Sequence, residues 1–145
     1  MNPFAFRLDP VLRVRDSERD QCRLRVAETL LDLQNVDQQI ATINQELKQA
    51  RAERSHLEGP VQVDRLLASD AYEAVLRERR HSHEGERATI VKTLDERRAA
   101  LLAADRAVRS LELLRESDFA QYRAEQRRRE TLEHDELASR GHSGS

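Results

Sequence analysis

The sequence comprises 145 residues, of which 36% are charged and 38% hydrophobic, so it offers little apolar material for a compact core. Its 25 basic and 27 acidic residues give a formal net charge of -2, which argues against the strongly basic surface of a dedicated nucleic-acid-binding protein. Three Phe, two Tyr, no Trp, four Gly and three Pro fit neither a sandwich of short strands nor a flexible linker, and they favour long helices.

No apolar run approaches the ~20 residues that a membrane-spanning helix needs, and the N-terminus has no signal-peptide pattern. We therefore expect a cytosolic protein that does not insert directly into a membrane. The single cysteine, Cys22, has no second cysteine in the chain with which to form a disulfide. Its place in an apolar repeat favours a small buried side chain over a reactive thiol.

The N-terminal segment offers two starting points for a helix. Asp9 followed by Pro10 is an N-cap followed by proline in the first turn, and the pair at residues 2–3 repeats this pattern earlier. Phe4 and Phe6 precede the later start. They either pack on a neighbouring helix or insert into a partner protein.

The first predicted helix is organised around an apolar seam. Reading residues 8–57 in steps of four and three gives fifteen positions, of which eleven are apolar. A 3.5-residue repeat of this length is typical of a helix that winds around another helix. At ~1.5 Å per residue, its helical part would extend about 70 Å. The seam positions are Leu8, Leu12, Arg15, Arg19, Cys22, Val26, Thr29, Leu33, Val36, Ile40, Ile43, Leu47, Ala50, Arg54 and Leu57.

A second, shorter apolar stripe lies off this seam. Leu24, Ala27 and Leu31 follow an i, i+3, i+7 spacing on the outward face of the same helix. The stripe is either a dock for a partner helix or ordinary surface apolarity.

Glycine and proline mark the end of the first helix. Gly59 takes the position that favours a left-handed backbone, and Pro60 prevents continuation, so we expect a helix over about 10–58 and a turn over 59–69. A short helical turn within the latter range is an alternative.

The second predicted helix runs over about 71–138, followed by a disordered tail over 139–145. Asp70 with Glu73 three residues later forms a capping-box pattern at its start. Its seam is clearest at Ile90, Leu94, Arg97, Leu101, Ala104, Val108 and Leu111.

Two long helices joined by a short turn must run antiparallel, because each supplies the seam that the other needs. The predicted fold class is all-α: a long two-helix antiparallel coiled-coil hairpin that forms a single elongated domain over 1–145. With Leu57 beside Ala71, paired residue numbers total about 128, and the second helix is longer by ~30 Å. Four aromatic residues then gather at the open end of the hairpin, namely Phe4, Phe6, Phe119 and Tyr122.

Beyond that end, the second helix carries the run Arg127, Arg128 and Arg129. Acidic neighbours such as Asp135 and Glu136 argue against a nucleic-acid site. We interpret the run as a partner-facing or solvated cluster.

We expect neither enzymatic activity nor a cofactor or metal. The sequence contains no Gly-rich phosphate loop, no His-Glu-x-x-His and no Gly-x-Ser-x-Gly pattern. His81 and His83 are two residues apart, a spacing that directs the rings to different sides of a helix.

Three stretches of this sequence resemble the flagellar export protein FliJ family. The opening FRLDPVLRVR at 6–15 is similar to its N-terminal pattern, and EQRRRE at 125–130 followed by DELA at 135–138 is similar to its C-terminal signature. YEAVL at 72–76 is similar to the start of its second helix. The resemblance covers the whole length and the two-helix plan.

The resemblance implies a cytoplasmic component of the flagellar type III export apparatus, peripheral at the inner membrane and serving motility and chemotaxis. The open end would enter the hexameric ring of the export ATPase, and the hairpin tip would meet the cytoplasmic domain of the export gate membrane protein. Export chaperones are further implied partners. The ATPase-binding residues would be Phe4, Phe6, Phe119, Tyr122, Arg127, Arg128, Arg129, Asp135 and Glu136.

The gate-binding residues implied by position and type are Gln38, Tyr72, Leu76 and His83. For Leu76 and His83 the alternative is that they fill the seam. Around Gln38 the chain lacks tyrosines that some family members carry. Two other functions stay open: the equivalent stalk of a virulence injectisome, and a generic cytosolic coiled-coil scaffold.

Overall fold

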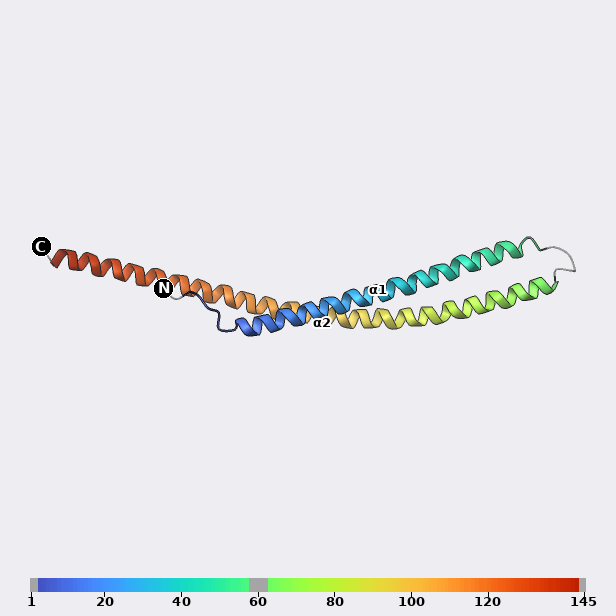
Figure 1. Cartoon of the computed structure of the whole chain (residues 1–145), viewed down its shortest axis with the longest axis horizontal. Helices are drawn as coiled ribbons and strands as arrows, with labels where there is room; N and C mark the ends of the chain where they lie inside the picture. The colour runs from blue at the N-terminus through green and yellow to red at the C-terminus, as the bar shows by residue number, and fades with distance from the viewer. Residues whose placement is uncertain (1–2, 58–62, 144–145) are drawn as a thin grey trace. The chain divides into compact units, whose positions relative to one another are not determined.

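Residues 3–57 and 63–143 are described by the computed structural model of this chain, and most of them belong to two long helices (Figure 1). The first helix, α1, spans Asp9–Arg54, and the second, α2, spans Val63–Ser143. Neither described range contains a strand, so the predicted all-α class is confirmed. Within the same ranges, no helix is long and apolar enough to cross a membrane.

The chain divides into two units, each of which contains one segment of α1 and one of α2. Unit 1 combines the described residues up to Gln21 with those from Leu102 onward, and unit 2 comprises Cys22–Leu101. Within unit 2 the two segments lie side by side and run in opposite directions, as the cyan-to-green part of α1 and the green-to-yellow part of α2 show in Figure 1. Unit 2 by itself therefore forms the predicted antiparallel helical hairpin.

The start of α1 is at Asp9, the later of the two starts that the sequence offers. The N–H of Asp9 donates to the carbonyl of Phe6 (3.1 Å), and the N–H of Leu12 donates to the carbonyl of Leu8 (2.9 Å). Pro10 lies in the first turn, where a missing N–H leaves no helical hydrogen bond unmade.

The helix ends on either side of the turn differ from the expectation. Helix α1 ends at Arg54 rather than near residue 58. The residues that follow form hydrogen bonds between residues three apart, such as Leu57 N–H to the Arg54 carbonyl (3.2 Å). Helix α2 begins at Val63 rather than at Ala71, so residues 63–69 are helical. The predicted stop at residues 59–60 lies outside the described residues.

Asp70 and Glu73 do not cap a helix, because both lie inside α2. Asp70 Oδ1 pairs with Arg54 Nη1 at 2.6 Å, and the buried Glu73 pairs with Arg77 at 3.2 Å. Their three-residue spacing fits a capping box, but spacing alone does not distinguish a cap from two acidic side chains engaged in ion pairs.

The far end of α2 also extends beyond the expectation. Residues 139–143, predicted as part of a disordered tail, continue the helix to Ser143. Arg140 and His142 lie in the last turn, where the positive charge of Arg140 interacts favourably with the helix dipole. The Ser143 hydroxyl donates to the Arg140 carbonyl at 3.1 Å.

The predicted seam of α1 is confirmed by burial. Of its fifteen positions, only Arg15 and Arg54 are exposed, and the others are buried or half-buried. In unit 2, Ile43 and Leu47 of α1 form a buried cluster with Leu76 of α2. Apolar contact along this stripe stabilises the helix pair, since burying a leucine side chain contributes ~1.5–3 kcal/mol.

A polar layer at Thr29 interrupts the seam of unit 2. Thr29 is buried, and its hydroxyl donates to the carbonyl of Arg25 at 2.7 Å. Nη1 of Arg97 donates both to Thr29 Oγ1 (2.6 Å) and to the Arg25 carbonyl (3.2 Å). A buried polar group left without its partner costs ~1–3 kcal/mol, so this layer favours one alignment of the two helices.

The pairing register differs from the predicted one by a helical turn. In unit 2, Asn44 Oδ1 accepts a hydrogen bond from Arg80 at 3.1 Å, and Asp37 pairs with Arg87 at 2.6 Å. In both pairs the residue numbers total 124 rather than about 128. The expectation placed Leu57 beside the start of the second helix, whereas α1 ends earlier and α2 begins earlier.

This register predicts two spin-label distances within unit 2. Labels at Gln45 and Lys92 should lie about 22 Å apart, and labels at Gln45 and Leu67 about 21 Å apart, given ~1.5 Å rise and ~10 Å between helix axes. Pulsed electron paramagnetic resonance measures both distances. The labels are attached to cysteines introduced into a Cys22→Ser background, so that the natural cysteine is not labelled. The register expected from the sequence gives about 17 Å and 26 Å instead, so unequal distances of this kind would contradict the structure.

Candidate functional site

Aromatic side chains gather in unit 1 where the N-terminal segment meets α2. The ring of Phe4 lies edge-on to Phe119 with centroids 5.2 Å apart, and it lies 5.5 Å from Tyr122. The guanidinium of Arg123 lies over the Phe119 ring at 5.8 Å. We call Phe4, Phe119 and Tyr122 the aromatic cluster. Phe6, which was expected with them, is buried and contributes to packing rather than to the surface.

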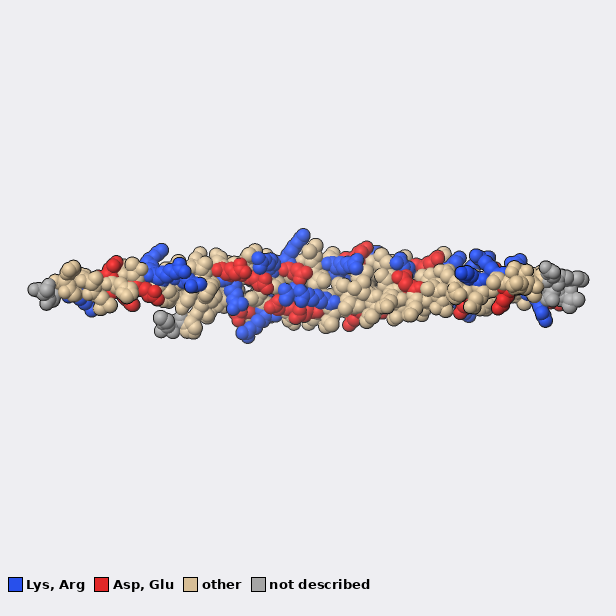
Figure 2. All heavy atoms as spheres, turned by 90° about the horizontal axis from the view of Figure 1, so that it is seen from above, with Lys and Arg blue, Asp and Glu red and all other residues tan. Residues whose placement is uncertain are grey.

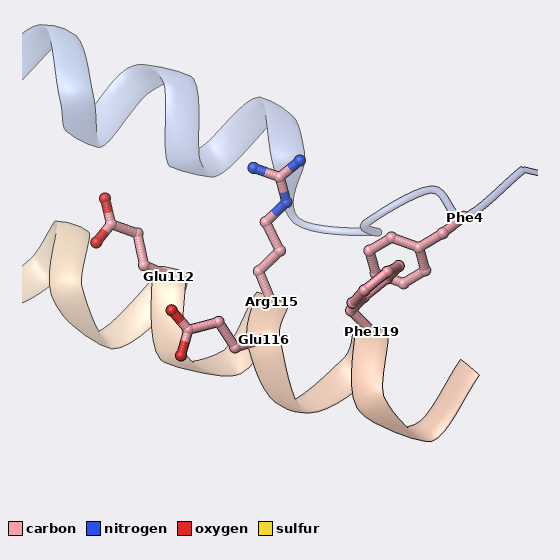
Figure 3. Close-up of a pocket in the computed structure, with 5 residues that line it drawn as sticks. All are labelled: Phe4, Glu112, Arg115, Glu116 and Phe119. Atoms are coloured by element: carbon pink, nitrogen blue, oxygen red, sulfur yellow. The ribbon is translucent and has the colours of Figure 1, made fainter. Parts of the chain in front are cut away.

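A groove of about 470 Å³ adjoins the aromatic cluster. Figure 3 shows Phe4 and Phe119 together at one end, while Arg115 extends from α2 toward the start of α1. Glu112 and Glu116 line the other end. The groove therefore offers an apolar contact beside a charged one. Sequence reasoning missed these charged residues, because their i, i+3, i+4 spacing is ordinary for a helix surface.

Past the aromatic cluster, α2 continues without cover from the rest of unit 1. From Arg123 to Ser143 every residue except Gln126 is exposed, and we call this stretch the uncovered segment. Arg127, Arg128 and Arg129 lie within it, and the last pairs with Glu125 at 3.2 Å. Figure 2 shows basic and acidic side chains intermixed on the face in view.

The uncovered segment also contains Asp135 and Glu136, both of which are exposed. Together with the three arginines, all five charged residues predicted to bind a partner here are accessible. Continuing the 4-3 repeat of α2 into this segment gives Glu125, Arg129, Leu132, Glu136 and Ser139. Such positions do not provide the apolar seam that a second coiled-coil helix needs.

The four residues expected to bind the gate lie in three different settings within unit 2. Leu76 is fully buried, with 0% of its surface exposed, so it fills the seam and is not accessible to a partner. Tyr72 is 50% exposed and borders a hollow of about 270 Å³ with Arg54 and Arg65. Gln38 and His83 line one shared groove elsewhere in the unit.

The groove that contains Gln38 and His83 has a volume of about 550 Å³. It is lined by carboxamides of α1 and by basic side chains of α2, and Nδ1 of His83 lies 3.2 Å from Glu86 Oε2. Sequence reasoning missed most of its lining, although the amide-rich run along α1 is visible in the sequence. The further lining residues are Asn35, Gln39, Thr42, Ile43, Glu46 and Arg79.

The off-seam stripe of α1 faces outward as predicted. Leu24, Ala27 and Leu31 are all exposed, the last at 60%. Their exposure fits both a dock for a partner helix and ordinary surface apolarity. Within the described parts of the chain, no group of three or more His, Cys, Asp or Glu side chains is arranged to hold a metal ion.

A protein-family model described as Flagellar FliJ protein matches residues 4–145. No curated protein and no solved structure matches the chain.

Proposed function

Because the chain belongs to the FliJ family and is therefore a flagellar type III export component, we propose that it serves there as a coiled-coil stalk that engages the export ATPase. The uncovered segment of α2 carries the proposal. It is a continuous exposed helix with three adjacent arginines, preceded directly by the aromatic cluster. A ring of ATPase subunits admits a slim helix of this kind through its central hole.

The residue types suit a protein interface. Partly exposed aromatic rings and guanidinium groups are the side chains that most often anchor such contacts. Phe4, Phe119 and Tyr122 supply the rings, and the arginine run supplies hydrogen-bond donors for carboxylates. Asp135 and Glu136 extend the charged surface. Because Phe6 is buried, it is not part of the surface proposed to contact the ATPase.

Replacing the three arginines together tests this assignment. The variant Arg127→Gln, Arg128→Gln, Arg129→Gln should bind the purified ATPase about tenfold more weakly at low salt, and the loss should shrink at high salt because ions screen exposed charges. Titration by fluorescence anisotropy at several ionic strengths measures the effect.

A matched control removes three arginines from unit 2. The variant Arg25→Gln, Arg51→Gln, Arg98→Gln carries the same change in net charge at exposed positions and should bind the ATPase normally. Equal losses in both variants would mean that net charge alone governs binding, which contradicts the assignment of the uncovered segment.

We further propose that Gln38, Tyr72 and His83 of unit 2 contact the cytoplasmic domain of the export gate. Tyr72 is half exposed, and the groove of Gln38 and His83 presents amide and imidazole groups that pair with polar partners. These contacts, rather than insertion, would hold the protein at the cytoplasmic face of the inner membrane. Leu24, Ala27 and Leu31 are candidates for export chaperone contact. The family match favours this flagellar role over an injectisome stalk or a generic scaffold.

A further inference from the structure

The first turns of α2 have side chains of two kinds on opposite faces. The face toward α1 contains the seam, with Glu73 and Leu76 buried. At 100° per residue, Val63, Leu67, Ala71 and Val75 follow one another at i+4 steps along the opposite face. All four are exposed, including 62% of Leu67, 51% of Val63 and 46% of Val75. We call this set the outer stripe.

Small side chains border the outer stripe. Ala68 and Ala74 lie on either side of it and are exposed. Single exposed leucines are ordinary on a protein surface, but an unbroken apolar row more than three turns long is typical of a surface that another helix covers. Alanine beside larger residues leaves grooves that accept the side-chain ridge of an approaching helix.

Acidic residues bracket the outer stripe. Asp64 lies at its beginning and Glu78 one turn beyond Val75, both exposed and in the same angular sector. Neither carboxylate forms an ion pair with the described residues of the chain, and this sector contains no Lys or Arg between them. Arg79, at the next i+4 step after Val75, lines the groove of Gln38 instead. The two acidic positions are separated by about 21 Å along the helix axis.

A second copy of this chain does not fit the outer stripe. Two copies would bring acidic residues together at both ends, and like charges repel. The stripe is also short, about 18 Å, and one helix face of this length covers much less than the ~800 Å² per partner of a stable dimer. An anionic membrane surface is disfavoured by the same carboxylates.

We propose that the outer stripe binds an amphipathic helix of another protein, whose apolar ridge is bracketed by basic residues. Large aliphatic side chains at i and i+4 of that helix would fit between the alanines, and its Lys or Arg residues would pair with Asp64 and Glu78. The outer stripe shares no residue with the uncovered segment, with the groove of Gln38 or with Tyr72, so the proposal does not depend on the ATPase or gate assignments.

Two designed peptides test the proposal on the full chain. Each is a fluorescent helix of about five turns with leucines at i, i+4 and i+8; one carries lysines at both ends of the leucine ridge and its twin carries glutamates. The lysine peptide should bind about tenfold more tightly than the twin. Equal affinities, or no saturable binding of the lysine peptide, would overturn the proposal.

Two substitutions locate the binding. Leu67→Ser should weaken the lysine peptide about tenfold, because a leucine contact is lost. Leu102→Ser removes another exposed leucine of α2, outside the outer stripe, and should have no effect. The reverse result would assign the peptide to the surface around Leu102 and contradict the proposal. Both side chains face away from the seam, and circular dichroism should confirm unchanged helicity.

A charge exchange completes the test. In the variant Asp64→Lys, Glu78→Lys the preference should invert, so that the glutamate peptide binds more tightly. Retained preference for the lysine peptide would contradict the paired charges. Light scattering provides a last check, since a dimer that Leu67→Ser dissociates would assign the outer stripe to a second copy.

Discussion

Removing the residues from Phe119 to the C-terminus is expected to abolish stimulation of ATP hydrolysis by the purified export ATPase. The truncation removes two rings of the aromatic cluster and the whole uncovered segment. It leaves the seam residues from Leu12 to Val108 in place, so most of the helical signal in circular dichroism should persist. The loss would then reflect missing contacts rather than unfolding.

A shorter truncation is the matched control. Removing residues 139–145 shortens the same helix but keeps the arginine run, Asp135 and Glu136, so stimulation should be retained. Full stimulation by the chain that ends before Phe119 would refute the proposed contact with the ATPase. Loss in both truncations would shift the contact to the last turns of α2.

The largest loss of stability is expected for Leu76→Ala. Leu76 has no exposed surface and packs with Ile43 and Leu47, so truncating it should lower the free energy of unfolding by ~2–5 kcal/mol. Urea denaturation followed by circular dichroism measures the change. A loss below ~1 kcal/mol would mean that the seam closes over the missing side chain.

Tyr72→Ala, one turn away, is the comparison for that experiment. Because Tyr72 is half exposed, its truncation should change the free energy of unfolding much less than Leu76→Ala. Binding to the cytoplasmic domain of the gate should instead weaken by ~1–3 kcal/mol if the ring is an anchor. A lower melting temperature for Tyr72→Ala would show that this ring holds the two helices together.

The sequence predicts the seam well, because a repeat of 3.5 residues fixes which face of each helix is buried. It does not predict the register, since a shift by one turn still brings seam against seam. The structure shows side-chain pairs between the helices, such as Arg54 with Asp70 and Asp37 with Arg87, that agree with one alignment. Long charged side chains have many candidate partners, and the sequence does not say which of them meet.

The candidate sites, too, were predictable only in part. The meeting of Phe4 with Phe119 and Tyr122 was predictable from helix lengths and the hairpin turn, and it is confirmed. Whether Leu76 is accessible could not be predicted. The family resemblance indicates a gate-binding residue on the surface, whereas its place in the repeat indicates a buried seam residue. The sequence analysis did not predict the outer stripe. Alanine carries a weak hydrophobic signal, and the expected helix began only at Ala71, so Val63 and Leu67 were not placed on it.

The fixed pairing of α1 with α2 also constrains how the length of this chain can change among relatives. An insertion of three or four residues between Asp37 and Asn44 would disturb the winding of one helix against the other, whereas a gain of seven would keep the seam in phase. The uncovered segment has no such constraint, because no helix of unit 1 is aligned with it. Relatives should therefore differ in length more freely after Tyr122 than within the paired helices.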